Sequence, residues 1–223
     1  MAEALDTQQT VAELAARLLS RARDAERVIV AVAGTAGSGK THLCGLVCAA
    51  VNAGAGAEVC VVLPLDGFHL SRAQLAAMDD PGLALRRRGA HWTFDGPGFA
   101  ALVQRVRDRP ADVVLAPSFD HAAGDPVPQV IAIRPHHRVV LIEGLYAHTS
   151  EEPWAHAAQL ADERWWISPR SPAAARRRLA QRHVAAGLAA DTAAAELRIA
   201  GNDDLNAAFV AAHRLTPTHV VLN

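Results

Sequence analysis

The sequence predicts a three-layer α/β fold, in which a mainly parallel central sheet carries helices on both faces. Short runs of consecutive apolar, β-branched residues recur along the chain, and such runs are typical of strands that are buried on both faces. Segments with helical spacing of apolar residues separate these runs, and this alternation builds a parallel sheet through crossover connections. Apolar residues make up 51% of the 223 residues, which is enough for the core of a single domain spanning 1–223.

The N-terminal elements follow this alternation. Helical spacing over 10–22 predicts a first helix, with Thr10 and Glu13 as its capping box. Buried strands are predicted over 27–34 and 57–66, separated by a glycine-rich turn and a helix. From residue 67 to about residue 93 the sequence is irregular and rich in Arg, His and Gly.

The remaining elements continue the pattern. Strands are expected over 112–117, 138–146, 164–168 and 218–223. Helices are expected over 94–108, near 152–162 and over 171–188, and two more short helices should precede the last strand. Ser171 and Pro172 are suited to the N-cap and the first position of the third of these helices. The stretch 118–128, S-F-D-H-A-A-G-D-P-V-P, is expected to be a loop.

Composition excludes several classes of protein. The net charge is −1 and the isoelectric point about 6.8, so we expect neither a nucleic-acid nor a membrane partner. No apolar run is long enough to span a bilayer, and the acidic N-terminus does not resemble a signal peptide. The three cysteines Cys44, Cys48 and Cys60 form no CxxC pair, which indicates a reducing compartment and no zinc site. We therefore expect a cytoplasmic protein.

A phosphate-binding motif follows the first predicted strand. The segment matches G-x-x-x-x-G-K-[ST] and comprises Gly34, Thr35, Ala36, Gly37, Ser38, Gly39, Lys40 and Thr41, with His42 directly after it. A buried strand before the motif and a helix after it form the context in which backbone N–H groups bind a nucleotide triphosphate. Lys40 should reach the β- and γ-phosphates, and the Thr41 hydroxyl should bind Mg²⁺.

Lys40 is the only lysine among the 22 basic residues of the chain. Arginine is a wide planar fork, whereas lysine is a compact point charge on a thin stem, so a tight loop with room for one ammonium requires lysine. The same count argues against a GTPase, because the N-K-x-D segment that reads guanine would need a second lysine.

Two carboxylates end strands that should emerge at the edge of the sheet where the glycine-rich turn lies. Glu143 ends the strand V-V-L-I-E and could hold Mg²⁺ or its water. Asp66 ends the second strand in L-D-G-F-H-L, where an acid suits a general base that takes a proton from an acceptor hydroxyl. Both are expected near the metal, together with Thr41.

Six segments follow one another along the chain in the order G-T-A-G-S-G-K-T, L-D-G-F-H-L, R-R-R-G-A-H-W-T-F-D, P-S-F-D-H-A-A-G-D-P-V-P, V-V-L-I-E-G-L-Y and R-R-R-L-A-Q-R-H. This order of motifs resembles the uridine kinase, phosphoribulokinase and type I pantothenate kinase superfamily. Within it the chain is most similar to the nucleoside/nucleotide kinase, or fructose-transport-kinase-like, proteins. The resemblance implies a P-loop NTPase fold with a helical lid over about 171–190. It also implies the use of ATP and Mg²⁺, phosphorylation of a small-molecule hydroxyl, and a homodimer as one expected assembly.

The same resemblance assigns roles to individual residues. Asp66 and Glu143 match the catalytic carboxylates, and Arg178 and Arg182 match lid arginines that contact the phosphates of ATP. These arginines are four residues apart and share a helix face, whereas Arg176, Arg177 and Arg178 cannot all face one ligand.

The acceptor hydroxyl is expected between segments 67–95 and 118–126. The candidate contacts there are His69, Arg72, Arg88, His91, Phe94, Asp120 and His121. His121 falls where pantothenate kinase has a substrate-contacting histidine, the run 86–88 would suit an anionic acceptor, and Phe94 would suit either a stacking contact or the core. The acceptor is left open among nucleosides, pantothenate-like compounds and sugars. Two other classes stay open, namely an NTPase whose output is hydrolysis and a nucleotide-dependent binding or regulatory protein.

Overall fold

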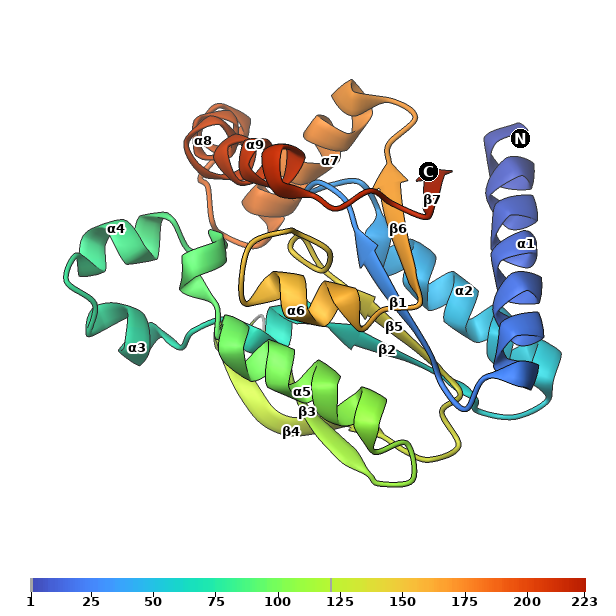
Figure 1. The fold of residues 1–223 in the computed structure, drawn as a ribbon. Helices are drawn as coiled ribbons and strands as arrows, with labels where there is room; N and C mark the ends of the chain where they lie inside the picture. Colours follow the sequence, from blue (N-terminus) through green and yellow to red (C-terminus); the bar gives the residue numbers. More distant parts are fainter. Residues whose placement is uncertain (1, 121) are drawn as a thin grey trace.

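The computed structural model describes residues 2–120 and 122–223, with the backbone alone for residues 2–7, and places them around a parallel sheet (Figure 1). The strand order is β2-β5-β1-β6-β7, and every pairing within this sheet is parallel. The strands are β1 (Val28–Ala33), β2 (Cys60–Pro64), β5 (Val139–Glu143), β6 (Glu163–Ser168) and β7 (His219–Leu222). The predicted fold class, a mainly parallel sheet between helices, is therefore confirmed.

The alternation of side chains along β1 divides the core into two layers. Val28, Val30 and Val32 pack with the helices α1 (Ala2–Asp24) and α2 (Lys40–Ala55). Ile29 and Ala31 point to the opposite face. The elements that cover this second face are α5 (Gly96–Asp108), α6 (Trp154–Gln159) and the hairpin of β3 (Val114–Asp120) and β4 (Asp125–Ile133). Because all six residues of β1 are buried, the turn that follows this strand starts from a rigid base.

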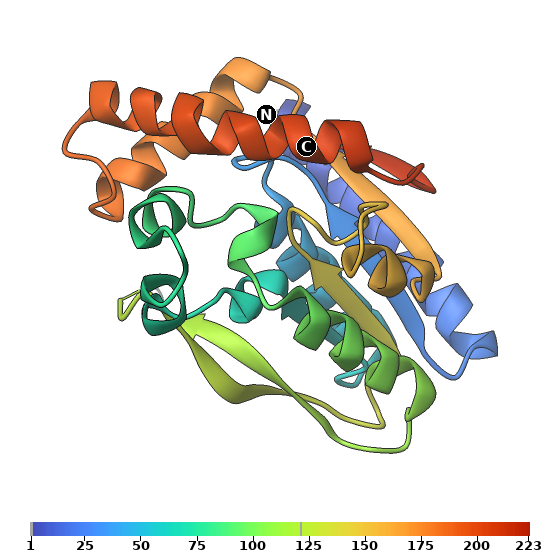
Figure 2. The same ribbon diagram turned by 60° about the vertical axis from the view of Figure 1, so that its left-hand side comes forward.

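The remaining helices surround the end of the sheet at which β1 and β5 terminate. Figure 1 shows α7 (Pro172–Ala185), α8 (Thr192–Arg198) and α9 (Asp204–His213) together at this end. The short helices α3 (Arg72–Ala76) and α4 (Pro81–Arg86) lie on the same side of the molecule. Figure 2 shows α8 and α9 as one long, nearly continuous helix, joined by the π-helical turn Ile199–Asp203. Within the described residues, none of the helices combines the length and the apolar character that crossing a membrane requires.

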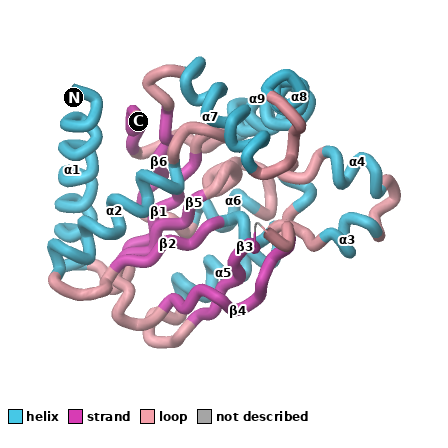
Figure 3. Tube along the Cα trace, turned by 180° about the vertical axis from the view of Figure 1, so that it is seen from behind, coloured by secondary structure: helices cyan, strands magenta, loops and turns pink. Residues whose placement is uncertain are grey.

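The expected loop over 118–128 was wrong. β3 runs on to Asp120, and β4, which the sequence did not predict, starts at Asp125. These strands form an antiparallel hairpin outside the parallel sheet (Figure 3), so the strand predicted at 112–117 does not join the central sheet. The prolines Pro126 and Pro128 argued against a strand, but a two-stranded ribbon consists of edge strands, where proline is tolerated.

Two further expectations about helices were wrong. Thr10 lies inside α1 and therefore does not cap it. The segment 67–93 is not irregular throughout, because α3 and α4 lie within it. Each of them starts at its own cap: Ser71 and Gln74 form a capping box on α3, and Asp80 accepts from the Leu83 N–H of α4.

A buried arginine joins the segments at the far end of the sheet. The side chain of Arg27 donates hydrogen bonds of 3.0 Å to the carbonyl oxygens of Val106, Pro110, Arg134 and His137. These oxygens belong to the end of α5, the loop after α5 and the connection from β4 to β5. One guanidinium therefore binds carbonyl acceptors from α5, from the loop after α5 and from the β4–β5 connection.

We expect Arg27→Met to lower the free energy of unfolding by about 3 kcal/mol, because buried carbonyl groups lose their donor. Urea denaturation measures the change. The matched control is Arg23→Met on the exposed face of α1, which should change the free energy by no more than about 0.5 kcal/mol. Equal effects of the two substitutions would contradict the role given to Arg27.

Candidate active site

The glycine-rich turn connects the buried end of β1 to the first residue of α2. Gly37 and Gly39 adopt left-handed backbone angles, with φ of 77° and 88°. Gly39 is the N-cap of α2 and offers no side-chain acceptor, so the first N–H groups of the helix remain available to a ligand. Ser38 is fully buried, and its hydroxyl has no hydrogen-bond partner in the protein. The turn thus has the form of an anion-binding loop.

The helix α7, which the sequence predicts as the lid, packs directly against this turn. A Cβ atom on Gly37 would lie 2.6 Å from the carbonyl oxygen of Ala175, so only glycine fits there. Arg178 of the same helix donates a 3.1 Å hydrogen bond to the Gly37 carbonyl. From the other side, the Asn223 side chain donates a 2.9 Å bond to the Ser38 carbonyl. The turn is held between α7 and the residue that follows β7.

A pocket of about 220 Å³ opens between the turn and the lid. Its lining consists of Gly37, Gly39, Lys40, Thr41, His42, Arg178, Leu179 and Arg182. Arg178 and Arg182 therefore face the same pocket, as their four-residue spacing predicted. Arg176 turns away and bonds to Glu196 and Asp204 instead. Three cationic side chains of this lining, from the turn and from the lid, make the pocket suitable for a polyphosphate.

Glu143 ends β5 next to the pocket residue Thr41 and is 5% exposed. The Thr41 hydroxyl donates a 3.0 Å hydrogen bond to Glu143 Oε1. Burial raises the pKa of the Glu143 carboxyl, and the negative charge of Asp66 raises it further; the charges of Lys40 and Arg182 and the Thr41 bond act in the opposite direction. These electrostatic effects show that the predicted carboxylates, the lysine and a lid arginine share one neighbourhood.

Asp66 is exposed and sits in the 3-10 turn Leu65–Phe68 directly after β2. The next residue, Gly67, approaches the Pro117 carbonyl of β3 so closely that no Cβ could be accommodated. Glycine after Asp66 is therefore required by the packing of β3 against the turn. Because β5 lies between β2 and β1, the carboxylates of Asp66 and Glu143 emerge from adjacent strands at the same edge of the sheet.

Two of the acceptor candidates, His69 and Phe94, form an aromatic group with Phe119. The His69 ring lies 4.0 Å from that of Phe94 and 4.9 Å from that of Phe119, measured between centroids. His69 Nδ1 is 2.8 Å from the Asp66 carbonyl oxygen, so this nitrogen donates. Phe94 is 8% exposed and belongs to the core of the second layer. Of the two roles open to Phe94, core packing is the one the structure supports.

The arginines of the run 86–88 differ in their surroundings. Arg88 donates to the carbonyls of Leu70 and Gly124 and to Asp125, so its charge is bound within the protein. Arg87 is likewise bound, to two asparagines, and Arg86 is exposed. The expectation that this run presents an anion site therefore receives no support from Arg87 or Arg88.

The other candidates are spread around the same side of the molecule. His91 stacks on Phe209 of α9 at 4.0 Å, and Arg72 is exposed at the start of α3. Asp120 accepts bonds from the backbone N–H groups of Ala122 and Ala123 and so shapes the hairpin turn. His121 lies outside the described residues.

The sequence analysis missed several residues that shape the site. They are Asn202, Asn206, Asp125 and Asn223, which tie the acceptor segment and the glycine-rich turn to the rest of the protein. The signal for the first two was present: Asn202 and Asn206 are four residues apart in otherwise alanine-rich helical text, so two amides share one helix face.

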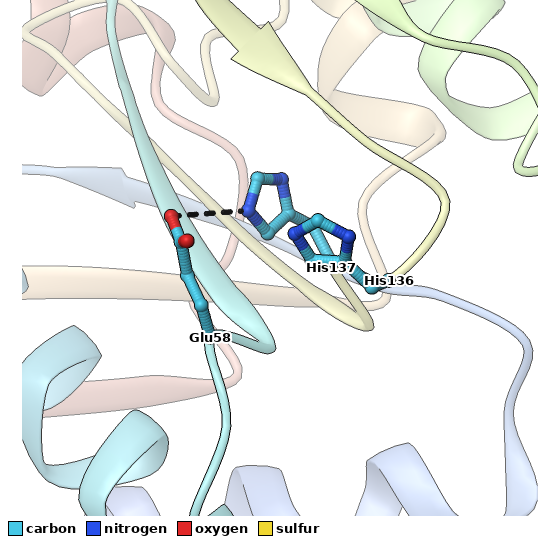
Figure 4. Close-up of side chains that lie close together, drawn as sticks. All are labelled: Glu58, His136 and His137. Atoms are coloured by element: carbon cyan, nitrogen blue, oxygen red, sulfur yellow. Dashed lines mark ion pairs between the residues drawn. The ribbon is translucent and has the colours of Figure 1, made fainter.

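A second group of ligand-type side chains, Glu58, His136 and His137, lies at the opposite end of the sheet (Figure 4). Their potential ligand atoms lie within 4.8 Å of one another. However, His137 Nδ1 accepts the Arg134 backbone N–H at 3.0 Å, so in the neutral ring Nε2 carries the proton, 3.5 Å from Glu58 Oε1. A metal at Nε2 would require a doubly deprotonated imidazole. We interpret the group as a histidine–carboxylate contact.

Comparison with known proteins identifies the family. No protein-family model matches the chain. The ATP-dependent kinase-like protein notR' of Aspergillus versicolor is 52% identical over 160 residues, which are 70% of this chain and 92% of that protein. A protein of Schizosaccharomyces pombe, named as a candidate uridine kinase, is 38% identical over 94% of this chain and 88% of its own length. The chain belongs to the P-loop kinase superfamily.

Solved structures agree with this assignment. A candidate fructose transport system kinase from Silicibacter is 32% identical, with a TM-score of 0.77 over 93% of this chain and 98% of that one. A protein of Saccharomyces cerevisiae described as a candidate P-loop kinase with a circular permutation shares the fold, with a TM-score of 0.84 over 98% of both chains at 22% identity. The resemblance drawn from the motifs is thereby confirmed, and this P-loop kinase is an ATP-dependent kinase.

We expect Gly37→Ala to weaken ATP binding by about tenfold or more, because a left-handed angle and the Ala175 carbonyl both oppose a Cβ atom. Isothermal titration with a nonhydrolysable ATP analogue measures the affinity. Gly56→Ala is the matched control, since Gly56 has a φ of 65° but nothing within 4 Å of its added Cβ. The interpretation fails if both variants bind the analogue as the wild type does.

Proposed function

We propose that this P-loop kinase transfers the γ-phosphoryl group of ATP to a hydroxyl of a small molecule bound beside Asp66. The observation that carries the proposal is the position of Glu143. Its carboxylate accepts a hydrogen bond from Thr41 of the nucleotide pocket, and its pKa is shifted by the charges of Lys40, Asp66 and Arg182. A cation of the pocket lining and an exposed carboxylate therefore both lie near one buried acid, an arrangement that suits phosphoryl transfer from a nucleotide to a second substrate.

In this proposal Asp66 accepts the proton of the acceptor hydroxyl. Asp66 is exposed at the sheet edge, next to the aromatic group of His69, Phe94 and Phe119, so a small molecule can reach it. The hydrogen bond of 2.8 Å from His69 Nδ1 to the Asp66 carbonyl oxygen fixes the turn that carries the carboxylate. A general base held in this way contributes about 10²- to 10⁴-fold to the rate.

Lys40, Arg178 and Arg182 would stabilise the charge on the group in transfer. They reach the pocket from two elements, α2 and α7, and Arg178 already bonds to the turn. Cations that are positioned before the reaction need no reorganisation when negative charge develops on the phosphoryl oxygens. The lid would also exclude water, which favours transfer to the acceptor over hydrolysis.

The residues also fit a magnesium ion. The Thr41 hydroxyl, which lines the nucleotide pocket, and the Glu143 carboxylate are hard oxygen ligands 3.0 Å apart, and Asp66 is a third candidate. A bound Mg²⁺ would neutralise charge on the phosphate oxygens. Thr41 and Glu143 would hold and orient it, and the buried position of Glu143 keeps its carboxylate in place.

We expect Asp66→Asn to reduce phosphoryl transfer by about 100-fold or more while ATP affinity changes little, because the amide cannot take a proton. ADP release is measured with and without nucleosides, pantothenate and sugars, and the phosphorylated product is identified by mass spectrometry. Asp79→Asn, an exposed acid in the α3–α4 connection, serves as control.

Each outcome of this assay decides between functions. ADP release that an acceptor stimulates, and that Asp66→Asn abolishes, supports the proposal. Slow release that no acceptor changes indicates a hydrolase, and tight ATP binding without turnover indicates a binding protein. Acceptor phosphorylation at the wild-type rate in Asp66→Asn would show that Asp66 is not the base.

The raised pKa of Glu143 predicts a pH dependence for metal-assisted nucleotide binding. As the pH falls, Glu143 takes up its proton at a higher pH than an ordinary glutamate does, and the neutral acid is a poor Mg²⁺ ligand. The gain in affinity that Mg²⁺ gives to an ATP analogue should therefore decline on acidification in the wild type. Glu143→Gln should show a small gain at every pH.

Calorimetric titrations across a pH series, with and without Mg²⁺, measure this gain. Comparing variant with wild type removes the titration of the nucleotide itself. Glu58→Gln, a remote and exposed acid, should behave as the wild type. A wild-type pH profile in Glu143→Gln would exclude Glu143 as the titrating ligand.

A further inference from the structure

Two buried asparagines of the C-terminal helices hold the acceptor segment. Asn202 and Asn206 are each 5% exposed. Arg87 donates through Nε to Asn202 Oδ1 and through Nη2 to Asn206 Oδ1, both at 3.0 Å. The Asn202 amide donates back to the Arg88 carbonyl at 3.0 Å. Side-chain amides facing a two-pronged guanidinium in this way fix both position and orientation.

The segment that Arg87 anchors also contacts several other parts of the acceptor side. Arg88 reaches the Leu70 carbonyl at 2.9 Å and Asp125 at 3.1 Å, and thereby joins the residues after Asp66 to the tip of the β3–β4 hairpin. Tyr146 donates to the Gly89 carbonyl at 2.8 Å. Residues 87–89 are therefore connected, through the Arg88 side chain, both to Leu70, two residues after the turn that carries Asp66, and to the hairpin.

The same C-terminal segment is bound on its other side to the lid. Arg176 of α7 contacts Glu196 at 2.6 Å and Asp204 at 3.0 Å, and His183 lies 3.6 Å from Asp203. An apolar cluster of Leu179, Ala180, Ala195 and Ile199 fills the space between α7 and α8. A movement of α7 would thus be transmitted to residues 196–206.

Adjacent residues of the π-helical turn contact different partners. Residues 199–203 form this turn inside the long helix formed by α8 and α9 (Figure 2). A π-turn inserts an extra residue and shifts the helix faces, and such turns are frequent at functional sites. Here Asn202 faces Arg87 while its neighbour Asp203 faces His183 of the lid.

We propose that Arg87, held by Asn202 and Asn206, is a positioning residue that couples occupancy of the nucleotide pocket to the ordering of the acceptor segment. The inference rests on the proposed function and deepens it, because it assigns a role to the contact between lid and acceptor site. Bound phosphates attract Arg178 and Arg182, which line the pocket on α7. The helix then holds residues 196–206 more tightly, and Arg87 passes this restraint to the backbone that supports Leu70 and the hairpin tip.

The test is amide hydrogen exchange of the full chain, measured with and without the Mg²⁺ complex of a nonhydrolysable ATP analogue. In the wild type the analogue should slow exchange in 34–42 and also, by about threefold or more, in 87–93. In Arg87→Ala the slowing in 34–42 should persist and that in 87–93 should disappear. A merely structural role would raise exchange in 87–93 equally with and without the analogue, leaving the ligand-dependent difference intact.

Three further variants sharpen the test. Arg87→Lys keeps the charge but cannot bond to both asparagines, so it should lose the coupling even if Arg87→Ala does not fold. Asn206→Asp keeps the oxygen that accepts from Arg87 and loses only a long, 3.4 Å bond to Asn202, so it should retain the coupling. Arg86→Ala removes an exposed arginine one position away and should behave as the wild type.

The outcomes separate this inference from the proposed function. Slowing in 34–42 without slowing in 87–93 in the wild type overturns the coupling and leaves the kinase assignment intact. Coupling that persists in both Arg87→Ala and Arg87→Lys overturns the role of Arg87. If the analogue protects neither segment, the nucleotide site itself is misplaced, and both proposals fail.

Discussion

The close packing of the turn after β1 against the backbone of α7 is the constraint on which the site depends. Left-handed angles at Gly37 and Gly39 curl the chain, and the Ala175 carbonyl leaves no room for a side chain at the first of them. Because β1 is buried along its whole length, this turn cannot shift to relieve the contact. Packing of α7 against the turn therefore carries Arg178 and Arg182 to the pocket that the turn lines.

The order of the strands then decides where the acids lie. β5 sits between β1 and β2, so Glu143 emerges beside the turn and Asp66 one strand further away. Burial separates their properties: Glu143 has a raised pKa and a fixed partner in Thr41, whereas Asp66 is exposed. In the proposed function this difference suits Glu143 to holding the metal and Asp66 to taking the proton of the second substrate.

The fold class, the glycine-rich turn and the two strand-end acids were predictable because each depends on local sequence. Apolar runs identify buried strands, and the position after a strand places a side chain at the sheet edge. The β3–β4 hairpin was not predictable in this way, since its prolines and polar residues resemble a loop until a partner strand is present. The contacts of Arg87 and Arg88 were missed for a related reason: their acceptors lie up to 119 residues away in sequence.

The single lysine and the many arginines follow one geometric rule. Arg27 satisfies four carbonyls, Arg87 bridges two asparagines, and Arg88 joins two loops, so each uses the several donors of a planar fork. None of these contacts suits an ammonium, which presents a single point of charge. Lys40 lies instead in the pocket between the glycine-rich turn and α7, where the proposed function has one compact cation approach the phosphate oxygens beside Arg178 and Arg182. The three arginines named above thus join segments of the chain, whereas the single lysine lines the pocket.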